Sequence, residues 1–298
     1  MAVKFKHYQQ EGSGGGTVEY APYLTFQSGE SFSMNVASPG WNNLMEYSTD
    51  TTTWSTWDGS LISAVQNSDA YVIYLRGTGN MKVSTSYDTK FSITGVNVKC
   101  IGNIENLLDY ATVANGEHPP MMDYSYSNMF RDCTSLTTAP ELPATTLTYN
   151  CYAYMFSDCT SLTTAPVLPA AVMHGACYKG MFSGCTSLTT APELSATTLE
   201  SSCYSAMFLG CTSLTTTPEL PATTLAGYCY QEMFKGCTSF KVSTAQFRTY
   251  KYAWRIPTSG TISKTSTSWN YRTLSGTGGE YVDSLSINTT YYLENAPV

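Results

Sequence analysis

Charged residues are scarce in this sequence. Asp, Glu, Lys and Arg make up 12% of the 298 residues, about half the usual share. Basic residues are the scarcer kind, since 15 of them stand against 22 acidic residues and give a formal net charge of −7. Phosphates and anionic lipids select basic patches, so this balance argues against nucleic acid or an anionic membrane as a partner.

Long hydrophobic runs are also absent. No stretch approaches the ~18 consecutive apolar residues that a membrane helix needs, so we expect no membrane insertion. Residues 1–8 have neither the apolar core nor the cleavage site of a secretory signal peptide. If Met1 is the natural start, we therefore expect that the protein does not use the general secretory route.

Patterns typical of catalysis and metal binding are missing too. The three histidines, His7, His118 and His174, are scattered, and no Cys-x-x-Cys pair occurs. No glycine-rich loop has the spacing of a nucleotide-binding turn, and no nucleophile stands in a recognisable elbow. The sequence predicts a protein that is not an enzyme, with no catalytic residue, no metal and no cofactor.

A 26-residue repeat dominates the centre of the chain. It is marked by Met-Phe pairs that begin at Met129, Met155, Met181, Met207 and Met233. Nine of the ten cysteines follow the same step. A fixed period of this size is typical of a solenoid. We expect residues 109–240 to form a leucine-rich-repeat-type solenoid of helix–strand coils.

One unit shows the expected local structure. In residues 151–159, Cys151, Met155 and Cys159 fall on one side of a helix at ~100° per residue. Residues 160–166 suit a short strand, whose pairing Pro166 would end. Along such a helix Cys151 and Cys159 are too far apart for a disulfide. We favour buried free thiols inside the coils, and pairing between neighbouring coils remains open.

The units differ from one another unevenly. Their Cys, Tyr, Met, Phe and Thr-Ser-Leu-Thr-Thr positions barely change, whereas two other sets of positions differ. One set is the outer helix positions 127/128, 153/154, 179/180, 205/206 and 231/232, and the other lies before each helix, at residues 148–150, 174–176, 200–202 and 226–228. We expect the strand side to carry a threonine ladder formed by Thr137, Thr163, Thr189 and Thr215. Such a face suits a periodic target such as a glycan chain, and it equally suits a passive spacer.

The repeat resembles that of the BspA-like leucine-rich-repeat proteins of anaerobic gut bacteria and their phages. Residues 181–194, Met-Phe-Ser-Gly-Cys-Thr-Ser-Leu-Thr-Thr-Ala-Pro-Glu-Leu, carry the likeness, which covers roughly residues 121–240. The resemblance implies surface-displayed adhesion or protein–protein contact without an enzymatic site.

The segments on either side of the repeat have other patterns. Residues 1–16 read as a flexible arm with a Gly-rich linker, either a disordered tail or a docking arm for other structural proteins. The candidate anchor residues of that arm are Lys4, Phe5, Lys6 and Tyr8. Residues 17–108 alternate as an antiparallel β-sandwich, with a hairpin around Asp50. Residues 241–298 read as a small β-rich module, either a cap or a contact surface. The candidate binding residues of this module are Phe247, Arg248, Tyr250, Tyr252, Trp254 and Arg255.

Together these features predict an α+β multidomain protein with a non-enzymatic binding function. We expect a surface-displayed adhesion protein that contacts a protein or glycan on a cell surface. A phage virion component (a fibre, decoration or receptor-binding protein for host attachment) is the preferred reading. A bacterial cell-surface adhesin is the alternative, and glycan binding is compatible with both. We expect a virion or extracellular location, and the features allow a homo-oligomeric fibre without requiring one.

Overall fold

The computed structural model describes residues 21–37, 44–83, 89–216, 218, 220–222 and 224–239. Beyond these it describes the backbone of five short strands between residues 262 and 293. The chain is mostly β, with several sheets, and the described residues contain one α-helix, α1 (Asn106–Ala114). No helix in the described part combines the length and hydropathy of a membrane-spanning segment.

Two sheets pack against each other in the N-terminal part. The larger has the strand order β10-β9-β1-β7-β3-β4, with β6 also paired to β7, and the smaller has the order β5-β2-β8. Strand β10 (Leu136–Thr138) of the larger sheet comes from the repeat region. The strands of this part are β1 (Leu24–Ser28), β2 (Ser33–Val36), β3 (Met45–Ser48), β4 (Ser55–Trp57), β5 (Ile62–Ser63), β6 (Val65–Asn67), β7 (Ala70–Gly77), β8 (Phe91–Thr94) and β9 (Val98–Ile101). Phe26 of β1 meets Phe91 of β8 edge to face, with ring centroids 5.7 Å apart, so the two sheets share a core.

The expected hairpin around Asp50 is confirmed. β3 pairs with β4 in antiparallel register, Met45 opposite Trp57. Asp50 Oδ1 accepts the backbone N–H groups of Thr52 at 2.8 Å and Thr53 at 2.7 Å. These backbone hydrogen bonds stabilise the carboxylate and lower the pKa of Asp50 to about 2. Asp50 therefore holds the turn as an Asx-type acceptor.

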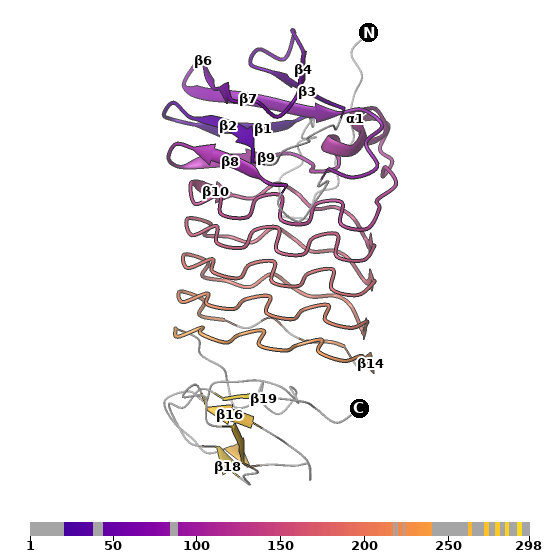
Figure 1. Ribbon diagram of the computed structural model, residues 1–298, viewed down its shortest axis with the longest axis vertical. Helices are drawn as coiled ribbons and strands as arrows, with labels where there is room; N and C mark the ends of the chain where they lie inside the picture. Colours follow the sequence, from indigo (N-terminus) through magenta and orange to yellow (C-terminus); the bar gives the residue numbers. More distant parts are fainter. Residues whose placement is uncertain are drawn as a thin grey trace, which may run out of the picture.

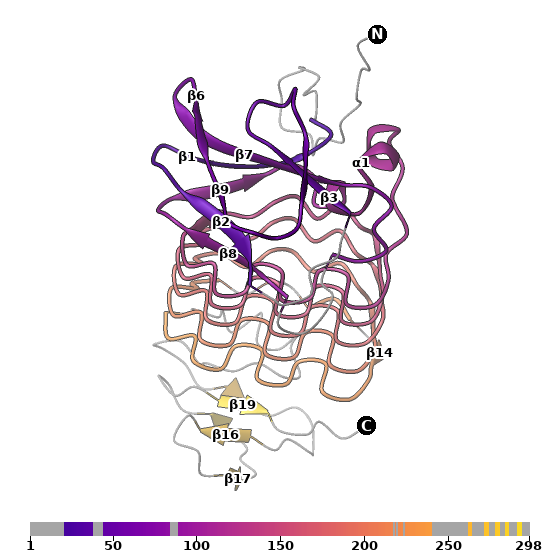
Figure 2. The ribbon, with the colours of Figure 1, turned by 45° about the horizontal axis from the view of Figure 1, so that its top comes forward.

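Below the sheets, the repeat units stack as coils (Figures 1 and 2). Backbone N–H groups of one coil donate to carbonyl groups 25 residues later, as in Tyr152 to Cys177 (3.1 Å) and Phe156 to Met181 (2.9 Å). Short parallel strands also join the coils, β11 with β12 and β13 with β14. The strands of the coils are β10 (Leu136–Thr138), β11 (Thr146–Leu147), β12 (Val172–Met173), β13 (Thr198–Leu199) and β14 (Thr224–Leu225).

The prediction of a helix at residues 151–159 is wrong. Odd-numbered residues donate within the coil to the carbonyl three residues earlier, as Met155 does to Tyr152, while even-numbered residues donate to the next coil. Asn150, Tyr154 and Asp158 have positive φ, so the backbone reverses every fourth residue. The segment is a row of successive β-turns, which gives the coils their wavy outline in Figure 1.

The strand expected after each helix is also shorter than predicted. Within the described residues of the coils, a regular strand occurs there only in the first coil: β10, which pairs in parallel with β9. In the next coils the pairing shrinks to single bridges that link Thr138, Thr164, Thr190 and Thr216. The proline two residues beyond each bridge, such as Pro166, lacks the N–H group that a longer ladder would need.

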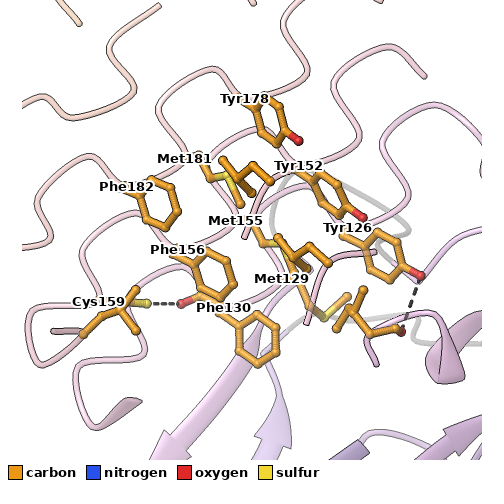
Figure 3. Close-up of a cluster of buried hydrophobic side chains, with 14 of the residues drawn as sticks. Tyr126, Met129, Phe130, Tyr152, Met155, Phe156, Cys159, Tyr178, Met181 and Phe182 are labelled. Carbon is orange, nitrogen blue, oxygen red and sulfur yellow. Dashed lines mark hydrogen bonds between the residues drawn. The ribbon is translucent and has the colours of Figure 1, made fainter. Parts of the chain in front are cut away.

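The interior of the coils is a set of stacked side-chain rows (Figure 3). The phenylalanine rings from Phe130 to Phe234 lie 5.4–5.7 Å apart, nearly parallel. Phe130, the first member of this row in the sequence, also contacts Phe91 of β8, with ring centroids 5.3 Å apart. One hydrophobic core therefore runs from the sheets into the coils, and α1 spans the domain boundary expected after residue 108.

Among the strands that the structure describes, those of the C-terminal segment pair with one another. β15 (Ile262–Ser263) pairs with β18 (Ser284–Leu285), and β16 (Tyr271–Thr273) pairs with β17 (Gly278–Glu280) and β19 (Tyr291–Leu293). All three pairings are antiparallel. Short strands in residues 241–298 agree with the β-rich character expected of this segment.

Candidate functional site

The predicted threonine ladder lies on the outside of the coils, except at its first member. Thr163, Thr189 and Thr215 are exposed, whereas Thr137 is half-buried in β10. The Thr137 hydroxyl donates to the carbonyl of Val98 at 3.2 Å, and the Thr215 hydroxyl donates to the carbonyl of Thr189 at 3.0 Å. The Thr137 hydroxyl thus joins the first coil to β9, and the Thr215 hydroxyl joins one coil to the coil before it.

The other predicted contact residues lie outside the described residues. This applies to the anchor arm (Lys4, Phe5, Lys6 and Tyr8) and to the C-terminal cluster (Phe247, Arg248, Tyr250, Tyr252, Trp254 and Arg255). The candidate surfaces whose side chains the structure describes are therefore those of the sheets and the coils.

An aromatic cluster on the larger sheet was not predicted. The Arg76 guanidinium lies 3.9 Å from the ring centre of Trp54 and 4.4 Å from that of Tyr110, and its Nε donates to Glu46 at 2.7 Å. Tyr23 packs against Trp54 with ring centroids 5.7 Å apart. Arg76 fills the space between the two rings, so this cluster stabilises the sheet by cation–π contact rather than leaving a platform open.

The positions that differ between units come together in space. We call residues 148–150, 174–176, 200–202 and 226–228 the variable strip. Backbone hydrogen bonds link its four triplets in order: Asn150 donates to Gly175 (3.1 Å), Ala176 to Ser201 (2.8 Å) and Ser202 to Gly227 (3.0 Å). Each triplet directly follows one of the strands β11 to β14, and Figure 1 shows β14 at the right-hand edge of the coils.

Aromatic side chains stand at both ends of the variable strip. Tyr149 is 45% exposed and Tyr228 is 61% exposed. Tyr149 also meets Tyr124 edge to face, with ring centroids 5.7 Å apart. A Cβ atom on Gly175 would lie 3.2 Å from Cε2 of Tyr149, so the glycine lets the ring lie close to the next coil.

Polar groups occupy the middle of the strip. Nδ1 of His174 lies 3.2 Å from Oε1 of Glu200, and both side chains are exposed. The Ser201 hydroxyl donates to the carbonyl of Gly227 at 3.0 Å. Aromatic rings, an imidazole, a carboxylate and a hydroxyl thus lie along one edge of the coils.

The cysteines are buried and free, as favoured from the sequence. Burial raises the pKa of Cys133 to about 12, and it also raises the pKa of Cys203 to about 12. In the described residues no three His, Cys, Asp or Glu side chains come together in a way that could hold a metal ion. Glu105 is buried beside His118, whose Nδ1 lies 2.7 Å from Oε2, and burial raises the pKa of Glu105.

The differences among the triplets of the strip are visible in the sequence, but they did not lead to the prediction of a site there. The signal was in the repeat itself, because triplets 26 residues apart must stack once the units form coils. Comparison with protein-family models, with curated proteins and with solved structures found no match for this chain.

Proposed function

We propose that the chain is a non-enzymatic binding protein displayed on a surface, built on a BspA-like leucine-rich-repeat solenoid. One observation carries the proposal. The coils repeat the same interior residues at every step, while the triplets that differ line up on one edge, where Tyr149, His174, Glu200 and Tyr228 are exposed. A stack of this kind is a scaffold that presents different side chains at regular intervals.

A phage virion is the preferred placement, and the surface of a bacterial cell is the alternative. The support is the likeness of residues 181–194 to repeat units of gut bacteria and their phages, together with the low charge and many hydroxyl groups of the sequence. In either place the protein would contact a cell surface, and its function would be adhesion or host attachment.

Binding of the fluorescently labelled full chain to intact cells of a panel of gut anaerobes tests the proposal. We expect saturable binding to at least one strain, displaced by excess unlabelled chain. A soluble protein of similar size and net charge serves as the control. If no strain binds the chain above that control, the proposed function is wrong.

A further inference from the structure

Comparison of the repeat units with one another distinguishes positions that pack in the interior from positions that are free to differ. Interior rows such as Phe156, Phe182 and Phe208 are identical because each coil meets the same neighbours. Exposure alone does not explain the differences in the variable strip, since Thr163 and Thr189 are exposed yet identical. The strip is therefore one of two sets of coil positions where the sequence departs from its own repeat, and it holds more of the exposed residues than the set at 127/128, 153/154, 179/180, 205/206 and 231/232.

The chemistry of the strip indicates the kind of ligand. Its four triplets are Thr-Tyr-Asn, His-Gly-Ala, Glu-Ser-Ser and Ala-Gly-Tyr, without any Lys or Arg. The carboxylate of Glu200 and the absence of basic side chains disfavour a phosphorylated or polyanionic ligand. Exposed tyrosine rings provide flat apolar faces with a polar edge, and the groups between them can donate and accept hydrogen bonds.

The shape of the strip favours an extended ligand. Tyr149 and Tyr228 stand three coil-to-coil steps apart, about 15 Å at the ~4.8 Å spacing of paired strands. Gly175 is buried against the ring of Tyr149, and the exposed Gly227 carries no side chain beside Tyr228. The strip is therefore elongated, with one exposed aromatic ring at each end.

We propose that the variable strip binds a neutral saccharide chain. Tyr149 and Tyr228 would stack on sugar rings at the two ends, while His174, Glu200 and Ser201 would hydrogen-bond to hydroxyl groups between them. This inference rests on the proposed binding function and names its site and its ligand class.

The test uses full-length variants in the cell-binding experiment. The double variant Tyr149→Ala with Tyr228→Ala removes both rings, and Tyr149→Phe with Tyr228→Phe keeps the stacking faces. The matched control, Thr163→Ala with Thr189→Ala, alters the exposed ladder on the same coils. We expect the alanine strip variant to bind at least about tenfold more weakly, as for the loss of two aromatic anchors. The phenylalanine variant and the ladder control should stay within about threefold of the unaltered chain. Thermal unfolding of each variant confirms that it is folded.

Chemical treatment of the cells tests the saccharide ligand separately from the proposed binding function. Periodate, which cleaves vicinal diols of sugars, should abolish binding, and soluble dextran, xylan, mannan or starch should compete if it contains the recognised unit. If the chain binds periodate-treated cells as strongly as untreated cells, the ligand is not a saccharide, although the proposed function stands. Unchanged binding by the folded alanine strip variant would overturn the site, whereas absence of binding to every strain counts against the proposed function itself.

Discussion

The Cys159 thiol donates a hydrogen bond to the carbonyl oxygen of Phe130, 29 residues earlier, at 3.0 Å (Figure 3). The same bond recurs down the stack, from Cys185 to Phe156, from Cys211 to Phe182 and from Cys237 to Phe208, at 3.0–3.1 Å. Each of these carbonyl groups already accepts the backbone N–H group of the cysteine in its own coil, and the thiol of the next coil adds a second donor. The thiols of this row are structural donors as well as small core residues.

Buried thiols with raised pKa values should be unreactive in the folded protein. All ten cysteines are free and buried, and the thiolate form is the reactive one. The protein is first reduced and the reductant is removed. We then expect Ellman's reagent at pH 8 to label none of the ten thiols in the native protein and all ten after unfolding in guanidinium. Rapid labelling of any repeat cysteine before unfolding would contradict the burial of its row.

The stability of the fold should decrease in alkali. In the unfolded chain a thiol ionises near pH ~8.5, whereas the pKa of the buried Cys133 is raised to about 12. The stabilisation is therefore fully present below pH ~8.5 and is lost as the pH rises towards about 12, because the unfolded state releases the proton first. Urea unfolding at pH 7 and pH 10, with reductant present, measures the loss. A Cys133→Ala variant should lose about 2 kcal/mol less over this interval than the unaltered chain. An equal loss of unfolding free energy in both proteins would contradict the raised pKa of Cys133.

The period of the repeat was predictable from the sequence, but the local structure of the coil was not. Cys151, Met155 and Cys159 recur every four residues, and this spacing fits one side of a helix. It fits equally well a row of turns that reverses every four residues, at Asn150, Tyr154 and Asp158. Periodicity cannot separate the two structures, and the deciding hydrogen bonds run to the next coil.

One sequence signal could have favoured turns over a helix. The columns that contain Tyr154 and Asp158 also contain Gly180, Gly184, Gly210 and Gly236, and all four glycines have positive φ. Glycine and Asn or Asp recurring at fixed positions indicate a left-handed backbone, which a helix interior lacks. The variable strip, in contrast, needed the stacking of the coils to become one surface, and the C-terminal candidates lie outside the described residues.

Gly180 should tolerate alanine poorly. Its φ is +60°, and an added Cβ would lie 2.3 Å from Cε1 of Tyr154. We expect Gly180→Ala to lower the free energy of unfolding by about 1–3 kcal/mol, because the ring must move. Combining it with Tyr154→Ala should cost less than the sum of the two single changes, since the clash disappears.

Gly227→Ala is the matched control for this series. A Cβ at Gly227 would have no heavy atom within 4 Å. Chemical denaturation should place this variant within about 0.5 kcal/mol of the unaltered chain. Equal effects of Gly180→Ala and Gly227→Ala would show that the close contact with Tyr154 is not the cause.

The phenylalanine row should dominate the stability of the coils. Phe182 is fully buried between Phe156 and Phe208, with ring centroids 5.7 Å away on each side. We expect Phe182→Ala to cost about 3–5 kcal/mol, measured by urea unfolding. Thr189→Ala in the same coil removes an exposed side chain and should cost no more than about 0.5 kcal/mol. Similar costs for the two variants would contradict the stacked core.

Peptide mass spectrometry on purified phage particles and on the cell envelope of the source culture tests surface display most directly. We predict that peptides of the coils, such as those from residues 132–179, are recovered from intact particles and are lost when particles are treated with protease under non-denaturing conditions. Recovery from the envelope alone would retire the virion placement in favour of a bacterial adhesin. Recovery only from the soluble contents of cells, with none in either surface fraction, would contradict the account.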